Sequence, residues 1–166
     1  MAGRHSGEES QELDLAQAAQ TLLDECRMVL PGIQALFGFQ LIAVFSERFS
    51  SELDKGDQVL HLVAIALVAI AVALVMTPAA YHRHRGARKV TDTFIELSTL
   101  LLLTSMVPLA AGLSIDFFLI ARLVLGGEGV AAALGAAIFA LMMFFWFAFP
   151  RIHGLHRLIA RHRKLA

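Results

Sequence analysis

Disulfide bonds and recognisable catalytic sequences are missing from this chain. Its 166 residues include one cysteine, Cys26, so no intramolecular disulfide can form and the stability has to come from helix packing. The sequence contains no glycine-rich phosphate loop, no serine-nucleophile motif and no carboxylate pair at a catalytic spacing. We therefore expect a protein that is not an enzyme and that binds no cofactor.

The seven histidines do not make up a metal-binding motif. His82 and His84 are two residues apart and point to different sides of any helix, and no cysteine or carboxylate completes a ligand set at a diagnostic spacing. His153 and His156 could share a helix face. Only His61 lies near the interior of an apolar stretch. A haem-binding redox protein therefore remains as a weaker alternative, and a role facing lipid headgroups suits most of these histidines better.

Long apolar stretches dominate what is present, since 57% of the residues are hydrophobic. Four of them run over about 28–45, 59–80, 95–118 and 130–149, and each has the roughly 20 residues that a helix needs to cross the hydrocarbon core of a bilayer. Closed β-barrels show a period of two, which is absent here. The short connections predict antiparallel neighbours. The predicted fold is all-α, an integral membrane up-down-up-down four-helix bundle over residues 28–149, with the lipid bilayer as its first partner.

The segments outside these spans are polar. Residues 1–10 are expected to be disordered, and residues 11–27 show apolar positions at spacings of three and four, which predicts a cytoplasmic amphipathic helix. That helix could lie on the membrane or pack against the spans. Its acidic face suits anionic lipid poorly, which favours packing. The N-terminus stays polar for two dozen residues, unlike a signal peptide. Residues 150–166 form a basic cytoplasmic tail.

The basic residues predict the orientation in the membrane. Two Lys or Arg lie in the N-terminal arm, four in the second loop and five in the tail, whereas only Arg48, Lys55 and Arg122 fall on the other side. Because positive charge collects on the cytoplasmic side, both termini are expected in the cytoplasm. We interpret the basic tail as a membrane-proximal anchor and expect no nucleic-acid partner.

The first two spans carry a pattern that resembles a known family. The pattern consists of Asp24-Glu25-Cys26-Arg27, Leu30-Pro31-Gly32-Ile33-Gln34, Leu36-Phe37-Gly38-Phe39, Phe45-Ser46-Glu47-Arg48-Phe49 and Thr77-Pro78-Ala79-Ala80-Tyr81-His82-Arg83. It is similar to short bacterial four-helix integral membrane proteins that form a family of unknown function, and the resemblance covers about Leu22 to Pro150. Membership implies a bacterial origin and the inner membrane. It brings no activity and no catalytic residues with it.

Five polar residues make up the candidate network inside or beside the spans, namely Arg27, Gln34, Gln40, Asp92 and Glu96. Glu96 follows Asp92 by four residues and lies about one turn inside the third span, where an acidic group is costly. We predict that Arg27 pairs with Glu96, or failing that with Asp92. Asp116 and Arg122 are interpreted as marks of the outer membrane boundary.

Two classes of function follow. The first is a non-enzymatic membrane scaffold or accessory subunit, and the second is a small oligomeric transporter or channel that uses Glu96, Gln34 and Gln40. A buried Glu96 facing a hydrated cavity would favour transport, and a Glu96 bridged to arginine at the surface would favour the scaffold. Small residues at Ala132, Ala136 and Ala140 indicate close helix packing, either within the chain or with a homo-oligomer or membrane protein partner.

Overall fold

The computed structural model describes residues 2–85 and 92–151, with side chains from Gln17 onward except at 48, 82, 84, 85 and 92. This part of the chain contains helices and no strand. The elements are α1 (Ala2–Val44), α2 (Glu47–Glu52), α3 (Lys55–Arg85), α4 (Asp92–Leu125), α5 (Glu128–Met143) and the short π-helix η1 (Phe144–Ala148). The all-α prediction is confirmed for these residues.

Four of these helices are long and apolar enough to cross a membrane. The suitable segments are Gln17–Val44, Lys55–Tyr81, Thr93–Leu125 and Glu128–Arg151. Three of them contain a stretch predicted from the sequence, and the first covers all of its stretch except residue 45. Each exceeds the roughly 20 residues that a bilayer core requires. The number and approximate position of the spans are therefore as predicted, and the chain has the make-up of a membrane protein.

Helix α1 is longer than the first predicted span. It runs without interruption from Ala2 to Val44, so the segment expected to be disordered over 1–10 is helical from Ala2, and the helix expected over 11–27 is continuous with the span. No glycine or proline lies between Gln11 and Arg27, and nothing there would stop a helix. Pro31 lies inside α1 and does not end it.

The N-terminal part of α1 packs against the other helices. Leu22 and Cys26 are buried in one core cluster with Ile33 of the same helix and with Val68 and Val75 of α3. Leu102 and Leu109 of α4 pack against this cluster, so α1, α3 and α4 share a core. Of the two placements left open for the segment 11–27, packing against the spans is the one observed from Ala19 onward.

The connection between α4 and α5 is shorter than the gap between the predicted spans 95–118 and 130–149. The carbonyl of Arg122 accepts a hydrogen bond from the backbone N–H of Gly126 (2.9 Å), and Gly126 has a φ of +66°, the left-handed conformation that commonly closes a helix. Helix α4 is therefore closed at Leu125, which lies beyond the predicted end at Phe118. Two glycines alone separate it from α5.

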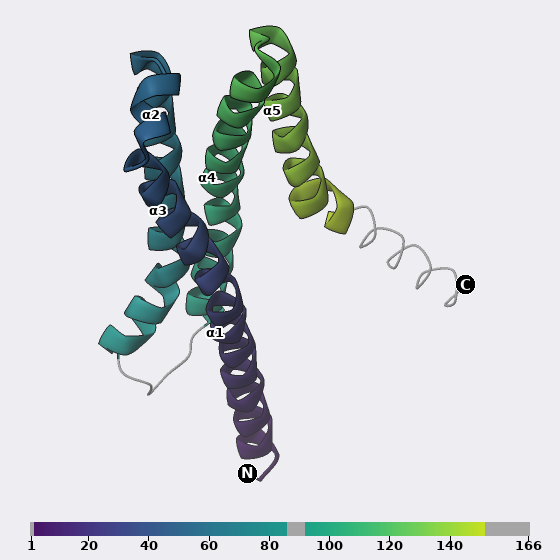
Figure 1. Cartoon of the computed structure of the whole chain (residues 1–166). Helices are drawn as coiled ribbons and strands as arrows, with labels where there is room; N and C mark the ends of the chain where they lie inside the picture. Colours follow the sequence, from purple (N-terminus) through teal and green to yellow (C-terminus); the bar gives the residue numbers. More distant parts are fainter. Residues whose placement is uncertain (1, 86–91, 152–166) are drawn as a thin grey trace, which may run out of the picture.

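Helix α4 lies between the other long helices. It packs most extensively against α3, then against α5, and least against α1. In Figure 1 the end of α1, helix α2, the start of α3 and the turn between α4 and α5 lie together at the top, whereas α5 leans away from α1 and α3. The end of the fold that carries α2 is called the α2 end below, and it holds most of the buried polar side chains.

Candidate functional site

Three polar side chains meet inside the α2 end, each from a different long helix. Gln40 of α1 and His61 of α3 are 4% and 8% exposed, and the side chain of Asp116 of α4 is 16% exposed. All three lie within segments suited to spanning a membrane, where burying a polar group costs free energy unless it has partners. We call these residues the polar triad.

The members of the polar triad are joined by hydrogen bonds. The side-chain amide Nε2 of Gln40 donates to Oδ2 of Asp116 (2.5 Å). His61 lies between the other two residues, with Nδ1 at 2.9 Å from Oδ1 of Asp116 and Nε2 at 3.1 Å from the backbone carbonyl oxygen of Gln40. The ring of Phe49 in α2 lies against His61, with 5.3 Å between the ring centroids. These contacts tie α1, α2, α3 and α4 together at one level.

Two arrangements of protons would satisfy every contact that His61 makes in the polar triad. Both ring nitrogens of His61 face oxygen atoms, and a neutral imidazole has only one N–H to donate. The contacts are satisfied if His61 is charged beside an Asp116 carboxylate, or if a protonated Asp116 donates to Nδ1 while Nε2–H donates to Gln40. Both arrangements contain the same number of protons and have no net charge. In either arrangement, one proton lies between Asp116 and His61.

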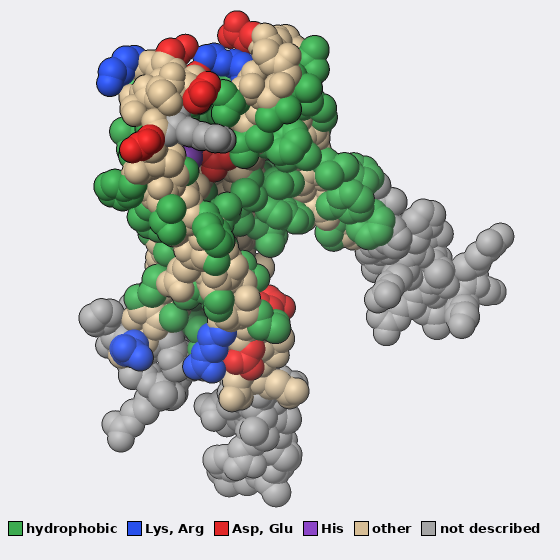
Figure 2. Space-filling model, viewed as in Figure 1, with side chains coloured by type: hydrophobic (Ala, Val, Ile, Leu, Met, Phe, Trp, Pro, Cys, Tyr) green, Lys and Arg blue, Asp and Glu red, His purple; other side chains and the backbone are tan. Residues whose placement is uncertain are grey.

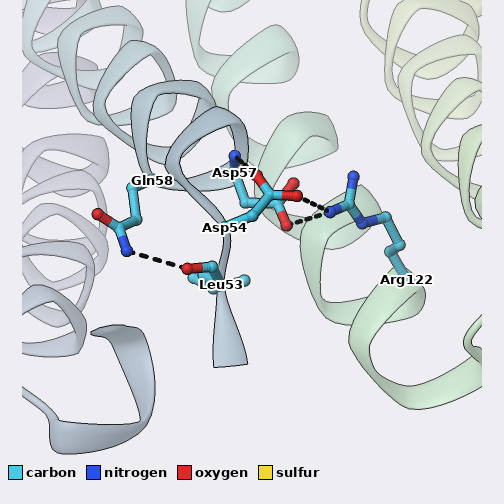
Figure 3. A network of polar contacts seen from close by, with 5 residues as sticks. All are labelled: Leu53, Asp54, Asp57, Gln58 and Arg122. Carbon is cyan, nitrogen blue, oxygen red and sulfur yellow. Dashed lines mark hydrogen bonds and ion pairs between the residues drawn. The ribbon is translucent and has the colours of Figure 1, made fainter. Parts of the chain in front are cut away.

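A second charged group lies beside the polar triad at the start of α3 (Figure 3). The Arg122 guanidinium of α4 contacts Oδ2 of Asp57 and lies 3.0 Å from Oδ2 of Asp54. The Asp57 side chain is 6% exposed and that of Arg122 is 30% exposed, so the pair is largely removed from water. Asp57 and His61 are four residues apart and share one face of α3. Asp57, Asp54 and Arg122 are called the acidic clasp.

Asp54 also forms the N-terminal cap of α3. Its Oδ1 accepts a hydrogen bond from the backbone N–H of Asp57 (2.9 Å), and the amide of Gln58 donates to the carbonyl oxygen of Leu53 (2.9 Å). The bond from the Asp57 N–H is the main cause that lowers the pKa of the Asp54 carboxyl, and the hydrogen bond and charge of Arg122 add to it. The cap is therefore a carboxylate at neutral pH, as suits a helix N-terminus.

A cavity of about 400 Å³ opens beside the polar triad. Among the described residues that line it, Gln40, His61 and Asp116 are polar, and the others are Leu36, Phe39, Ala43, Phe49, Leu53, Leu113, Phe117, Leu119, Ile120 and Leu123. Figure 2 looks onto this face and shows a histidine and an acidic side chain set below the surface between α1–α2 and α4. Oε1 of Gln40 is buried and has no hydrogen-bond partner among the described residues. An apolar cavity with a few convergent polar groups is typical of a small-molecule site.

The sequence-derived network is not brought together by the fold. Gln40 is buried in the polar triad, whereas Gln34 and Glu96 are exposed and the side chain of Asp92 lies outside the described part. Within the described part of the chain, Arg27 pairs with Asp24 at 3.4 Å, one turn back on α1, and not with Glu96. Arg27 and Asp24 are both well exposed. No burial cost therefore forces Arg27 to find a partner on another helix.

His61, Asp116 and Arg122 are functional candidates whose contacts with other helices were not predicted from the sequence. Asp116 and Arg122 were interpreted as marks of the outer membrane boundary, with no partner named for either. The depth of these residues along the predicted spans was the usable sequence signal. If neighbouring spans are antiparallel, the end of the first span, the start of the second span and the end of the third span lie at the same depth. Adding His61 and Gln40 to that level would have predicted the polar triad.

The contacts of His61 also bear on the haem-binding alternative. Both ring nitrogens of His61 are engaged, so neither is free to bind a haem iron in this conformation. The side chains of His82 and His84 and the residues His153 and His156 lie outside the described part. Among the residues with described side chains, no group of three or more His, Cys, Asp or Glu is placed to hold a metal ion.

The model of a family of unknown function, DUF6328, matches residues 8–150. No curated protein and no solved structure matches the chain.

Proposed function

The chain belongs to DUF6328, a family of unknown function, and since that family supplies no activity, we propose from the geometry that the protein binds an amphipathic small molecule within the membrane and does not transform it. The carrying observation is the cavity at the α2 end, which combines a long apolar wall with the polar triad at one side. Oε1 of Gln40, buried without a partner among the described residues, supplies an acceptor for a polar head. The apolar wall suits a hydrocarbon body.

The buried or exposed state of the polar residues also distinguishes between the two functions expected from the sequence, transport and scaffold. The proposal of transport through Glu96, Gln34 and Gln40 is weakened, because the side chains of Glu96 and Gln34 are exposed and only that of Gln40 is buried. A scaffold or accessory subunit stays as the second candidate. It is favoured by α5, which packs on α4 and leaves the small residues Ala132, Ala136 and Ala140 exposed for close contact with another helix. Native mass spectrometry of the protein in nanodiscs would detect such an assembly as a stable dimer or heteromer.

We further propose that the protein is a multi-pass component of a bacterial inner membrane, with up-down-up-down spans and both termini in the cytoplasm. The ribbon supports alternating directions, because the α2 end gathers the end of α1, the start of α3 and the α4–α5 turn (Figure 1). The distribution of lysine and arginine supports the orientation, since the α2 end carries few of them. This orientation places the cavity near the outer face of the membrane.

The orientation can be tested by labelling single cysteines in whole cells with a membrane-impermeant maleimide. In a Cys26→Ser background, Glu52→Cys at the α2 end is expected to react in intact cells. Arg83→Cys near the end of α3 is expected to react only after permeabilisation. Both side chains are exposed, so accessibility to the reagent depends on the side of the membrane. The opposite labelling pattern would invert the proposed topology.

Ligand binding in the cavity can be tested with a neutral amphipathic photoprobe, an octanol that carries a diazirine. In nanodiscs, adducts mapped by mass spectrometry are expected to concentrate on cavity-lining residues such as Phe39, Leu113 and Phe117. Ala43→Trp fills the cavity and is expected to lower this labelling several-fold. Ala35→Trp adds the same bulk to an exposed position of α1 that does not line the cavity, and is expected to leave labelling unchanged. Even labelling over all lipid-facing positions would contradict the proposal.

A further inference from the structure

We propose that the occupant of the cavity is a lipophilic monovalent cation, and that it binds in exchange for the single proton shared by Asp116 and His61. This inference rests on the proposed binding function and specifies its ligand. Three independent features support it, which are the charge balance around the cavity, the aromatic side chains in its wall and the proton count of the polar triad.

The charge around the cavity favours a cation over an anion. In the acidic clasp, two carboxylates, Asp54 and Asp57, face the one guanidinium of Arg122, which leaves one negative charge. The polar triad is neutral with its proton and carries one negative charge without it. Among the described side chains that the cavity and the clasp contribute, an anionic head would therefore meet acidic groups and no unpaired cation. A cation would gain an attraction that low dielectric strengthens.

The aromatic wall supplies the second feature. Phe39, Phe49 and Phe117 come from three helices and line the same cavity as the Asp116 carboxyl. Aromatic faces attract cations whose charge is spread and weakly hydrated, and the attraction grows when the site excludes water. A large organic cation with apolar substituents meets both requirements of this cavity, because its body replaces lipid contacts and its charge faces Asp116.

The exchange follows from the proton count. When the cation enters, the shared proton leaves to water, Asp116 becomes a carboxylate with a neutral His61 beside it, and the net charge of the filled site is unchanged. Without a cation, the deprotonated pair would have a net negative charge in a mostly apolar wall and one imidazole lone pair facing an oxygen. Proton and cation therefore compete for one site, and each lowers the affinity of the other.

Among the described side chains, the other charged groups around Asp116 and His61 are paired with one another or exposed. Helix α1 contributes the uncharged Gln40. Helix α3 contributes Asp57, and Asp54 precedes it, both paired with Arg122 of α4. On the outside, Lys55 donates to Gln58 (3.3 Å). Helix α2 carries Glu47 and Glu52, which are exposed, and Arg48, whose side chain lies outside the described part.

The test measures binding of tetraphenylphosphonium to the full-length protein in phosphatidylcholine nanodiscs, with empty nanodiscs subtracted. One cation per chain is expected, and its affinity, measured at about pH 6 and at about pH 8, is expected to be higher at the higher pH because one proton is displaced. Asp116→Asn is expected to lower the affinity at least tenfold at the higher pH and to remove the pH dependence. An asparagine at 116 still offers one acceptor and one donor, so the hydrogen bonds of the triad are retained. Glu96→Gln, the matched change at an exposed position of α4, is expected to change neither.

Three outcomes would overturn the inference. They are binding without pH dependence, an equal loss of affinity in Asp116→Asn and Glu96→Gln, and a phospholipid that native mass spectrometry finds retained and that tetraphenylphosphonium does not displace. The neutral analogue triphenylphosphine oxide distinguishes failure of the cation assignment from failure of the proposed binding function. If it binds and the photoprobe labels the cavity while the cation does not bind, only the cation assignment fails. If none of the three probes enters the cavity, the proposed binding function fails as well.

Discussion

Replacing Asp116 with leucine is expected to lower the free energy of unfolding by about 3 kcal/mol. The leucine leaves the Nδ1 of His61 and the amide of Gln40 without their partner, and both side chains are buried. An unsatisfied buried polar group costs about 1–3 kcal/mol, and two such groups share this site. The measurement is unfolding of the purified protein in mixed micelles by increasing anionic detergent, followed by circular dichroism.

Two variants serve as controls for this result. Asp116→Asn is expected to cost less than about 1 kcal/mol, because the asparagine oxygen can accept from Gln40 and its amide can donate to a neutral His61. Glu96→Leu makes the same change as Asp116→Leu at an exposed position of α4 and is expected to stay within about 0.5 kcal/mol. If Asp116→Leu were as stable as Glu96→Leu, the polar triad would contribute nothing to the fold.

Replacing Gly112 with leucine is expected to have the other large effect, a loss of about 3 kcal/mol or more. Helices α3 and α4 lie close together at this position. A Cβ atom at Gly112 would lie 3.0 Å from the backbone oxygen of Ala64 and 3.0 Å from Cγ2 of Val68, and both residues are fully buried. The backbone oxygen cannot rotate away, so the two helices have to separate.

Gly38→Leu is the matched control for Gly112→Leu. No atom lies within 4 Å of a Cβ at Gly38, so the same added volume points into open space beside α1. Its stability is expected to stay equal or to rise by up to about 1 kcal/mol, since leucine favours a helix more than glycine does. Far-UV circular dichroism during the same detergent titration would compare the two. Equal stability of both variants would contradict the close approach of α3 and α4.

The polar triad illustrates what sequence reasoning could and could not reach. The level of Gln40, His61 and Asp116 in the membrane follows from counting residues from the span ends, so their proximity was within reach. Their mutual orientation was not, because it depends on how each helix is rotated about its own axis. The predicted pair of Arg27 and Glu96 met the level requirement in the same way. The rotation of α1 and α4 left both side chains on the surface.

The span boundaries show a related limit. The sequence placed the end of the third span at Phe118 because Asp116 and Arg122 are charged, whereas α4 continues to Leu125. Each of these charges has a partner on α3, namely His61 for Asp116 and Asp57 for Arg122. A charge that is paired and hydrogen-bonded is tolerated inside a helix packed against others. The hydropathy of one segment does not depend on residues of another helix, so it cannot predict that partner.

The sequence by itself determined that the chain is helical, that four helices are long and apolar enough to cross a membrane, and roughly where they lie. These properties are set by segment length and by the need of backbone groups in lipid to bond within their own segment. Tertiary structure decided which polar residues meet, because contacts across helices depend on rotation and spacing. Gly112 sets the approach of α4 to α3. With that spacing, Gln40, His61 and Asp116 converge beside a cavity, while Gln34 and Glu96 remain on the outside.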